Sequence, residues 1–476
     1  MPTMETSNTG GIDLRLSAAL AVAKATATGI RIAGRGGGTS APGLVADRID
    51  PGLLTKLTGR LEHGVIIVAG TNGKTTTSRM IADMLEAAEM PTVHNRSGSN
   101  LLRGVVSAFA GQASIVGGLG GTVGVIEADE AALPQILARV TPRVLLLNNL
   151  FRDQLDRFGE LDAIVRKWRP ALQALGPDTT VVVNADDPTL TAITADIAAR
   201  VVTFGVDDGG HRLDALSHAA DVPACRVCGH DLDYRALYLS HLGDWFCPSC
   251  GNARPSPDVT GARIALKGVE SLQVDVVTGD ETTSVGIGVP GLYNAYNLLA
   301  AVTVGRQMGL AMPVIAGAMA SFRSAFGRIE RVAYRDRELT LALVKNPVGF
   351  NEVLRMLTAE TGGLEVPTLI AINDLDADGR DVSWLWDVDF ELLADGGGPL
   401  GTTGIRGADM ANRLRYAGIP DERLTRYPDA LDAALDAFVE TIPAAGSGYI
   451  LPTYTAMLQI RKFLADRGAV ETFWKQ

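Results

Sequence analysis

The chain reads Val65-Ile66-Ile67-Val68-Ala69-Gly70-Thr71-Asn72-Gly73-Lys74-Thr75-Thr76-Thr77, an apolar strand that leads through a glycine-flanked turn into a helix. The apolar spacing of residues 78–85 predicts that helix. Backbone N–H groups in such a turn point at phosphate oxygens, and a neighbouring lysine adds positive charge. The full P-loop motif is not present, because Val68 stands where its first glycine would be. This order of strand, turn and helix predicts an α/β nucleotide fold that binds ATP.

The side chains of the turn indicate how it would hold a nucleotide and its metal ion. We expect Lys74 to lie near the β- and γ-phosphates and the Thr75 hydroxyl to bind Mg²⁺. Glu127 follows the predicted strand 123–126 and would share this Mg²⁺ if the two strands are neighbours, because hard cations prefer oxygen ligands. A helix cap or a solvated acid stays open as the role of Glu127. The predicted nucleotide-binding residues of the turn are Gly70, Thr71, Asn72, Gly73, Lys74, Thr75 and Thr76.

The composition argues against several classes of protein. The chain has 476 residues, of which 46% are hydrophobic, enough to bury the cores of two or three domains. A net charge of −11 argues against a nucleic-acid-binding protein, which needs a basic face. No apolar run is long enough to span a membrane, and the N-terminus lacks the positive charge of a signal peptide. We therefore expect a cytoplasmic protein.

The four cysteines form two pairs with the spacing of a structural zinc site: Cys225 with Cys228, and Cys247 with Cys250. Four thiolates would close a tetrahedron around Zn²⁺ and leave no position for catalysis. Two disulfides are the alternative, but nothing in the sequence points to an oxidising compartment. We expect His230 and His241 to be surface residues and not ligands.

Short apolar runs separated by helical stretches predict a parallel sheet that is covered on both faces. These runs are residues 65–69, 123–126, 144–147 and 181–183. Residues 207–258 interrupt the pattern and read as an insertion, with the zinc ribbon at about 222–255. Two strands, at 272–277 and 285–289, would return the chain to the sheet, and a helix would follow at 294–308.

We expect three parts in the chain. Residues 1–60 form an N-terminal helical segment whose helix 14–32 would pack on the core or touch the membrane surface. Residues 61–330 form the ATP-binding domain. Residues 331–476 form a smaller C-terminal α/β domain, with strands expected at 339–344, 368–372 and 448–451.

Six motifs occur in the order found in the Mur ligase family of peptidoglycan synthesis, which this chain resembles. They are Gly70-Thr71-Asn72-Gly73-Lys74-Thr75-Thr76, Glu127-Ala128-Asp129-Glu130, Asn148-Asn149 with Asp153-Gln154-Leu155-Asp156, Asn184-Ala185-Asp186-Asp187-Pro188, Gly291-Leu292-Tyr293-Asn294-Ala295-Tyr296-Asn297-Leu298, and Gly327-Arg328-Ile329-Glu330. The resemblance implies an ATP-dependent ligase that phosphorylates a carboxylate and lets an amine attack the acyl phosphate. It also implies that Asn294 and Asn297 approach the adenine side and that Arg328 helps to position nucleotide and substrate. Lys345-Asn346-Pro347 is similar to the His-Asn-Pro element of the family, so Asn346 transfers as a nucleotide-site residue.

Two departures from the family pattern are informative. Only residues 1–64 precede the strand of the ATP loop, which is too short for the domain with which typical Mur ligases grip a UDP-linked substrate. We therefore expect an acceptor without UDP. Gln154 stands where the family usually has histidine, and Lys167 is one position out of register with its carbamylated lysine.

The C-terminal half narrows the resemblance to the MurT family, the synthetase subunits of lipid II isoglutaminyl synthase. The likeness covers nearly the whole chain, from about residue 15 to residue 470. The segments that carry this likeness are 373–390, 402–406 and the cysteine ribbon. The resemblance implies that ATP activates the α-carboxyl of D-glutamate in the lipid II stem peptide and that ammonia converts it to D-isoglutamine. It implies action at the inner face of the membrane. It also implies a class-I-like glutaminase partner, whose Cys-His pair is completed by an aspartate of this chain.

A separate argument also requires an external source of ammonia. A glutaminase of that class needs a free thiolate, whereas every cysteine of this chain is assigned to zinc. For the aspartate that would orient the partner's imidazole, we expect Asp381 first and Asp387 second; helix caps, turns and solvated charges are the alternative. Trp384 and Trp386 would share a face if their segment is extended, and both ordinary packing and a partner-binding patch stay open for them.

Other functions share the nucleotide motifs. A folylpolyglutamate-synthase-like ligase, or another Mur-type amino-acid ligase, would require turnover that depends on an amino acid, and it gives no reason for a zinc ribbon. A regulatory ATP-binding protein would bind nucleotide without forming an amide.

Overall fold

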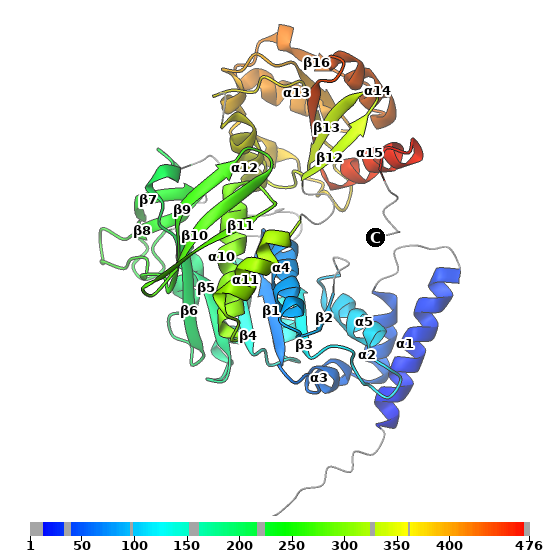
Figure 1. The fold of residues 1–476 in the computed structure, drawn as a ribbon, viewed down its shortest axis with the longest axis vertical. Helices are drawn as coiled ribbons and strands as arrows, with labels where there is room; N and C mark the ends of the chain where they lie inside the picture. Colours follow the sequence, from blue (N-terminus) through cyan, green and yellow to red (C-terminus); the bar gives the residue numbers. More distant parts are fainter. Residues whose placement is uncertain are drawn as a thin grey trace, which may run out of the picture.

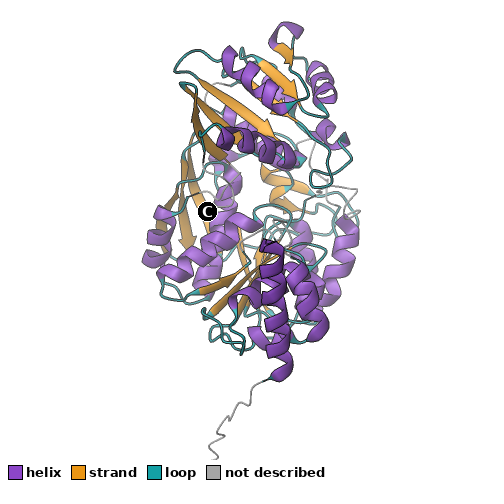
Figure 2. Cartoon of the chain, turned by 90° about the vertical axis from the view of Figure 1, so that its right-hand side faces the viewer, coloured by secondary structure: helices purple, strands orange, loops and turns teal. Residues whose placement is uncertain are grey.

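The computed structural model describes residues 13–32, 40–95, 99–151, 161–216, 224–323, 329–359 and 362–470. Within these residues, the strands form a nine-stranded sheet, a six-stranded sheet and a two-stranded ribbon. Figures 1 and 2 show the six-stranded sheet and its helices at one end of the molecule, above the larger sheet.

The first sheet has the order β11-β10-β9-β6-β5-β4-β1-β3-β2. Its strands are β1 (Val65–Ala69), β2 (Thr92–His94), β3 (Val123–Ala128), β4 (Val144–Leu147), β5 (Thr180–Asn184), β6 (Arg200–Val206), β9 (Val259–Lys267), β10 (Ser271–Thr278) and β11 (Glu281–Ile287). The pairings from β2 to β9 are parallel, which confirms the predicted parallel sheet. The returning strands β10 and β11 join it in antiparallel fashion, so the sheet is mixed at this edge.

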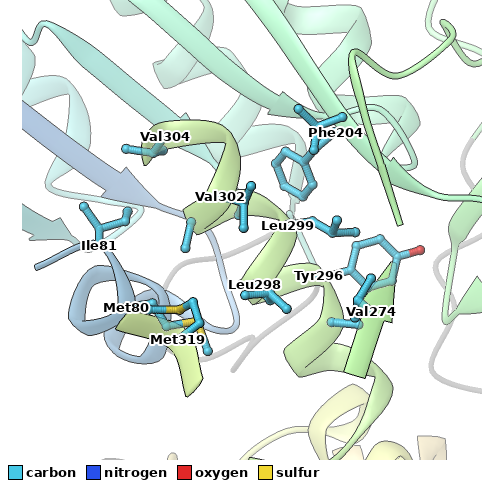
Figure 3. Close-up of a cluster of buried hydrophobic side chains, with 14 of the residues drawn as sticks. Met80, Ile81, Phe204, Val274, Tyr296, Leu298, Leu299, Val302, Val304 and Met319 are labelled. Atoms are coloured by element: carbon cyan, nitrogen blue, oxygen red, sulfur yellow. The ribbon is translucent and has the colours of Figure 1, made fainter. Parts of the chain in front are cut away.

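Both faces of the first sheet are buried. Ile66 and Val68 of β1 belong to one apolar cluster, whereas Ile67 and Ala69 belong to another, as expected for side chains that alternate across a strand. Figure 3 shows part of the first cluster, with residues from α4, α10, α11, β6 and β10. The helices are α1 (Leu14–Ile32), α2 (Ala41–Ile49), α3 (Leu53–Thr58), α4 (Lys74–Ala87), α5 (Leu102–Gln112), α6 (Leu133–Leu137), α8 (Leu161–Gln173), α9 (Pro188–Thr194), α10 (Leu292–Gln307) and α11 (Met312–Ser321).

Helix α1 packs on the protein core. It buries Leu16, Ala19, Leu20 and Ala23 in the cluster that also contains Phe109 of α5, which confirms the core-packing interpretation. Within the described residues, no helix combines the length and the apolarity needed to cross a membrane.

The C-terminal domain contains the second sheet, with the order β12-β13-β17-β14-β15-β16. Its strands are β12 (Ile329–Tyr334), β13 (Arg337–Ala342), β14 (Thr368–Ala371), β15 (Leu400–Thr403), β16 (Leu424–Arg426) and β17 (Ser447–Pro452). Its helices are α12 (Pro347–Thr358), α13 (Gly407–Tyr416), α14 (Leu431–Thr441) and α15 (Tyr454–Asp466). Each of the three strands predicted from sequence in this half is present.

The insertion leaves the first sheet after β6 and returns at β9, its parallel neighbour. Between them lies the two-stranded ribbon of β7 (Asp233–Leu239) and β8 (Leu242–Phe246), at the left of Figure 1. The predicted insertion is therefore present. Strands β5 and β4 separate β6 from β1, the strand that leads into the nucleotide loop.

Candidate functional site

The turn between β1 and α4 lies at the carboxyl edge of the first sheet, where α/β folds bind nucleotides. Gly73 adopts φ +83°, and a Cβ atom added there would lie 2.0 Å from Oδ1 of Asn297. Only glycine therefore fits between the turn and α10. Helix α4 begins at Lys74 without a side-chain cap, so its N-terminus can offer N–H groups to an anion.

Lys74 folds back over this turn. Its Nζ donates to the backbone oxygens of Gly70 (2.5 Å) and Thr71 (3.1 Å), and it forms a buried ion pair with Glu130 at 3.0 Å. Glu130 belongs to one of the six sequence motifs, but no role was predicted for it. Its carboxylate keeps the lysine charge beside the loop, close to where phosphates would lie.

Thr75 and Glu127 lie together, as predicted. Strands β1 and β3 are parallel neighbours with Val68 opposite Glu127, and the Thr75 hydroxyl donates to Oε1 of Glu127 at 3.1 Å. Asn95 holds Glu127 in place by bonding to its backbone N–H (2.8 Å) and its backbone oxygen (2.9 Å). A hydroxyl and a carboxylate at this separation are the donor set that Mg²⁺ prefers, so the residues fit the ion.

Thr71 and Thr76, the two other threonines of the turn, differ in their hydrogen bonding. The Thr71 hydroxyl accepts from the backbone N–H of Phe151 at 3.0 Å and donates to its carbonyl at 3.1 Å, so it joins the turn to the segment that follows β4. The Thr76 hydroxyl is buried and has no hydrogen-bond partner among the described residues.

A network of amides connects the turn to β4 and α10. Asn149 accepts from the backbone N–H of Asn72 at 2.8 Å, and Asn148 donates to Oδ1 of Asn297 at 3.0 Å. Asn297 in turn donates to Asn294 at 2.9 Å. The structure therefore connects Asn297 to the loop through Asn148, and Asn294 to Asn297. Their approach to the adenine, which the resemblance implied, stays a prediction. Every one of these side chains is buried, so the loop geometry is fixed before a ligand arrives.

The C-terminal domain reaches the loop through one further asparagine. Asn346 caps α12 by accepting from Gly349 N–H at 2.9 Å, and it donates to Oδ1 of Asn72 at 2.9 Å. A pocket opens beside this bond, between the two sheets. Its lining includes Asn72, Gly73, Asn149, Asn297, Lys345 and Asn346 on the polar side, and Phe151, Leu239, Leu242, Tyr293, Tyr296 and Val348 on the apolar side.

The apolar wall of this pocket was not predicted from the sequence. Tyr293 and Tyr296 stand in the quoted asparagine motif on α10, and their spacing of three places them on one helical face. That spacing is a usable signal. Phe151 lies four residues after the end of β4. Leu239 and Leu242 come from the ribbon, and nothing local in the sequence connects them to the loop.

The four cysteines form a cluster in which all sulfur atoms lie within 4.8 Å of one another. They are free thiols, so the disulfide alternative is not realised. Gly229 N–H donates to the Cys225 carbonyl (2.7 Å) and Gly251 N–H to the Cys247 carbonyl (3.0 Å), which makes two matching turns around the cluster.

The thiols of the cluster differ in their pKa values. Burial raises the pKa of the Cys225 thiol, but the backbone N–H groups of Cys228 and Val227 and the neighbouring thiols oppose it and bring the pKa to about 6. The backbone N–H of Asn252 lowers the pKa of the Cys250 thiol, but burial and the other thiols outweigh it and raise the pKa to about 12. Four convergent thiols are the donor set for structural Zn²⁺. The residues therefore fit the ion.

The two histidines of the ribbon have different environments. His230 is exposed, as predicted. His241 is 2% exposed, so the prediction of a surface residue is wrong for it. It lies at the tip of the β7–β8 hairpin, and its burial results from contacts with Phe151 and Asp187, which are remote from it in sequence.

The aspartate-rich segment lies in the C-terminal domain, away from the loop pocket. Most of its acids have partners: Asp374 pairs with Arg406, Asp376 with Arg380, Asp378 with Thr455, and Asp389 with Arg355 and Asn351. Asp387 is half-buried, and Asp381 is exposed. The structure therefore separates these two candidates by their accessibility.

Asp381 has only a local contact among those that the structure defines. It accepts from the backbone N–H of Ser383 at 2.8 Å, and this bond, with the Ser383 hydroxyl, lowers the pKa of the carboxyl below its usual range. Asp381 also lines a cavity with Trp386, Arg406 and Asp409. It is thus an ionised carboxylate with free acceptor positions.

Trp384 and Trp386 do not share a face, because residues Ser383–Asp387 form a 3₁₀ helix and not an extended segment. Trp384 is buried against Phe350, with 6.4 Å between the ring centroids. Trp386 is 52% exposed and stacks edge-on against Tyr416 at 5.3 Å. Core packing therefore applies to Trp384 only.

Several predicted residues lie outside the described part of the chain, namely Arg328, Asp153, Gln154 and Asp156. Lys167 lies on α8 and is exposed, whereas its neighbour Trp168 is buried and donates to the Glu130 backbone oxygen at 2.8 Å.

The fold and the phosphate loop define a Mur-type ligase. The family described as the Mur ligase middle domain matches residues 68–222, and the family described as MurT ligase C-terminal matches residues 343–457. Solved structures with this fold include a pseudomurein peptide ligase type C from Methanothermus fervidus, with a TM-score of 0.66 at 16% identity over 87% of this chain and 80% of the other. MurF from Thermotoga maritima in complex with ADP gives a TM-score of 0.60 at 13% identity over 87% of this chain and 82% of the other.

Curated relatives narrow the class. The chain is 33% identical over 438 residues to the MurT subunit of lipid II isoglutaminyl synthase (glutamine-hydrolyzing) from Streptococcus pneumoniae, covering 91% of this chain and 94% of that protein. The MurT subunit from Staphylococcus aureus (strain COL) is 31% identical over 422 residues, with coverage of 88% and 91%. The chain belongs to the MurT family.

Proposed function

We propose that this chain is the synthetase subunit of a lipid II isoglutaminyl synthase. In this role it uses ATP to convert the α-carboxyl of D-glutamate in the lipid II stem peptide to the amide of D-isoglutamine. The observation that carries the proposal is the bond between Asn346 and Asn72, because it joins the MurT-type C-terminal domain to the phosphate loop of a Mur-type ligase.

The proposed reaction has two steps. A carboxylate oxygen attacks the γ-phosphorus of ATP, the bond to the β-phosphate oxygen breaks, and ADP leaves. Ammonia then attacks the carbonyl carbon of the acyl phosphate, the carbon–oxygen bond to phosphate breaks, and the nitrogen loses a proton. Both steps place negative charge on phosphate oxygens, which positively charged groups and helix N-termini stabilise.

The residues of the loop have separate roles in this proposal. Lys74 would hold the phosphates, and the N-terminus of α4 would donate to them. Thr75 and Glu127 would hold Mg²⁺, which supplies charge neutralisation for the triphosphate. The pocket beside Asn297, with its aromatic wall, would receive the adenine. Arg328 stays a proposed positioning residue for nucleotide and substrate.

Ammonia would come from a glutaminase subunit of the class-I type. All four cysteines converge on one cluster, so this chain offers no free thiolate for glutamine hydrolysis. Asp381 is our first candidate for the aspartate that orients the partner's imidazole, because it is exposed and ionised, and Asp387 is second. The exposed Trp386, beside Asp381 in the same cavity, supports docking at this face.

We also propose Zn²⁺ as the ion of the four-cysteine cluster, and the division of the chain into residues 1–60, 61–330 and 331–476. The proposed place of action is the cytoplasmic face of the membrane, because the substrate implied by the resemblance is attached to a lipid.

The test is amidation of lipid II by the purified chain with MgATP and ammonium chloride, followed by mass spectrometry of the stem peptide. We expect the small mass decrease that accompanies replacement of a hydroxyl by an amino group, and ADP formation that requires lipid II. The variant Lys74→Ala should lose both signals by about 10³-fold. The exposed Lys267 provides a matched control, and Lys267→Ala should retain both signals.

The same assay separates the competing ligases. A folylpolyglutamate-synthase-like enzyme would form ADP when a folate and L-glutamate replace lipid II and ammonium. Such turnover, together with an unchanged lipid II mass, would contradict the proposal.

A further inference from the structure

The ribbon has two ends with different surroundings. At the cysteine end, the buried apolar cluster consists of Cys225, Leu232, Trp245 and Cys247 only. At the opposite end, Leu239 and Leu242 belong to the main core of the first sheet. A cluster as small as the first cannot by itself hold a segment in one conformation. A metal crosslink between the two cysteine turns would supply the missing stabilisation.

The end of the ribbon that lies in the core also reaches the nucleotide pocket. Leu239 ends β7 and Leu242 begins β8, and both line the pocket together with Phe151. A seven-residue strand spans roughly 20 Å, so the hairpin extends from the cysteine cluster at one end to the pocket wall at the other. The ribbon is thus part of the site and not an appendage on the surface.

His241 supports the segment that positions the loop amides. Its ring lies 5.0 Å from that of Phe151, and its Nε2 lies 3.7 Å from Oδ2 of Asp187. The same Asp187 oxygen accepts from the backbone N–H of Leu150 at 2.8 Å, directly between Asn149 and Phe151. The hairpin tip is itself held by Tyr234, whose hydroxyl donates to the His241 carbonyl at 2.9 Å.

A second connection starts beyond the second cysteine turn. Arg254 pairs with Oδ1 of the buried Asp186 at 2.7 Å, and Oδ2 of Asp186 accepts from the Tyr296 hydroxyl at 2.7 Å. Tyr296 lines the pocket, and Figure 3 shows it on α10 among the core residues. Trp245 adds a bond from its Nε1 to the Ala185 carbonyl at 3.0 Å. Two separate chains of contacts therefore run from the ribbon to the pocket.

We propose that the cysteine ribbon is a positioning element of the nucleotide site. Its hairpin tip forms one wall of the pocket for the base, through Leu239 and Leu242, and metal at the four cysteines holds that wall in place. Metal content then controls nucleotide affinity. This inference rests on the proposed function, since it takes the pocket to be the site of a purine nucleotide.

The first test uses a pair of leucines that differ in position only. Leu242 and Leu272 are each 1% exposed and belong to the same core cluster, but Leu242 lines the nucleotide pocket and Leu272 does not. We measure MgADP affinity by calorimetry in Leu242→Ala and Leu272→Ala. We expect about tenfold weaker binding for Leu242→Ala and binding within about twofold of the unchanged chain for Leu272→Ala.

The second test removes the metal. Cys228 and Cys250 are the exposed members of the cluster, so the double variant Cys228→Ser/Cys250→Ser removes two ligands with little loss of packing. We expect loss of zinc, faster hydrogen exchange in residues 233–246 and 149–151, and about tenfold weaker MgADP binding. The backbone amides of β1 and β4 should stay protected from hydrogen exchange.

The outcomes separate the two proposals. MgADP binding by Leu242→Ala that equals that of the unchanged chain would overturn the inference, as would unaltered affinity in a folded, metal-free chain. If the double variant does not fold, the Leu242→Ala measurement still decides. If the unchanged, zinc-loaded chain does not bind MgADP at all, the proposed function fails, and this inference fails with it.

Discussion

The phosphate loop is buried and bonded to three other segments, whereas Asp381 lies exposed with one local backbone contact. In the loop, Asn149 and Asn346 both bond to Asn72, and Glu127 accepts from Thr75, so the contacts that fix the turn all come from this chain. At Asp381 the carboxylate still has free acceptor positions. The contrast indicates that one half of the proposed reaction is built into this polypeptide and that the other half is completed by a partner.

The largest effect that tests this contrast is expected at Asp381. In the complex with the glutaminase subunit, Asp381→Asn should lower glutamine-dependent amidation by up to ~10⁴-fold, the loss seen when the orienting aspartate of a catalytic triad is replaced by asparagine. Amidation with ammonium chloride should be unchanged, because the loop is intact. Steady-state rates with the two nitrogen sources measure both.

Two variants in the same segment serve as comparisons. Asp376→Asn removes an exposed carboxylate that pairs with Arg380 and should leave both rates unchanged. Asp387→Asn tests the second candidate. If Asp387→Asn reduces the glutamine-dependent rate and Asp381→Asn does not, the assignment of the helper residue moves to Asp387.

The next effect concerns the loop side of the contrast. Glu127→Gln replaces the carboxylate opposite Thr75 by a neutral amide that binds Mg²⁺ weakly, so the Mg²⁺ concentration at half-maximal rate should rise about ten- to a hundredfold. Titration of ammonium-dependent ADP formation with Mg²⁺ provides the measurement.

Glu130 offers a matched control for this change. It is buried three residues beyond Glu127, just after β3, but pairs with Lys74. Glu130→Gln leaves that lysine charge without its carboxylate, so we expect a loss of about 3 kcal/mol in the free energy of unfolding and a Mg²⁺ requirement within about twofold of the original. Equal Mg²⁺ requirements in Glu127→Gln and Glu130→Gln would argue against a metal site at Glu127.

Trp384 and Trp386 test whether the face beside Asp381 binds the glutaminase subunit. Trp386 is half-exposed, so Trp386→Ala should change the free energy of unfolding by about 0.5 kcal/mol but weaken the complex with the glutaminase about tenfold. Trp384→Ala, at a buried position, should cost about 3–5 kcal/mol of stability. Chemical unfolding and a binding titration separate the two roles, and a Trp386→Ala complex of unaltered affinity would exclude that face as the docking site.

Sequence patterns predicted those features of the fold and the site that residues close together in the chain determine. Strand β1, the turn and α4 are adjacent in the chain, so their order was enough to place Lys74 and Thr75. Placing Glu127 near Thr75 required only that β3 be a parallel neighbour of β1. The antiparallel edge at β10 and β11 was not predicted, because periodicity reports burial and not direction. His241 was wrongly expected at the surface, because its burial depends on contacts with Asp187 and Phe151 that are remote in sequence.

The smallest expected effect lies where the two regions meet, at Asn346. This residue both caps α12 and bonds to Asn72, so an alanine would confuse loss of helix stability with loss of the contact. Asn346→Ser keeps a good N-cap while its shorter side chain gives up the bond to Asn72. A single hydrogen bond contributes about 1 kcal/mol, so the KM for ATP should rise about fivefold with little change in thermal stability.

Asn351→Ala serves as the control, because Asn351 lies on the same helix but bonds to Asp389. This variant should lower the thermal stability and leave the KM for ATP unchanged. If the KM for ATP does not change in Asn346→Ser, the bond between Asn346 and Asn72 would not contribute to ATP binding. The C-terminal domain would then contribute to the nucleotide site only through the residues that line the pocket.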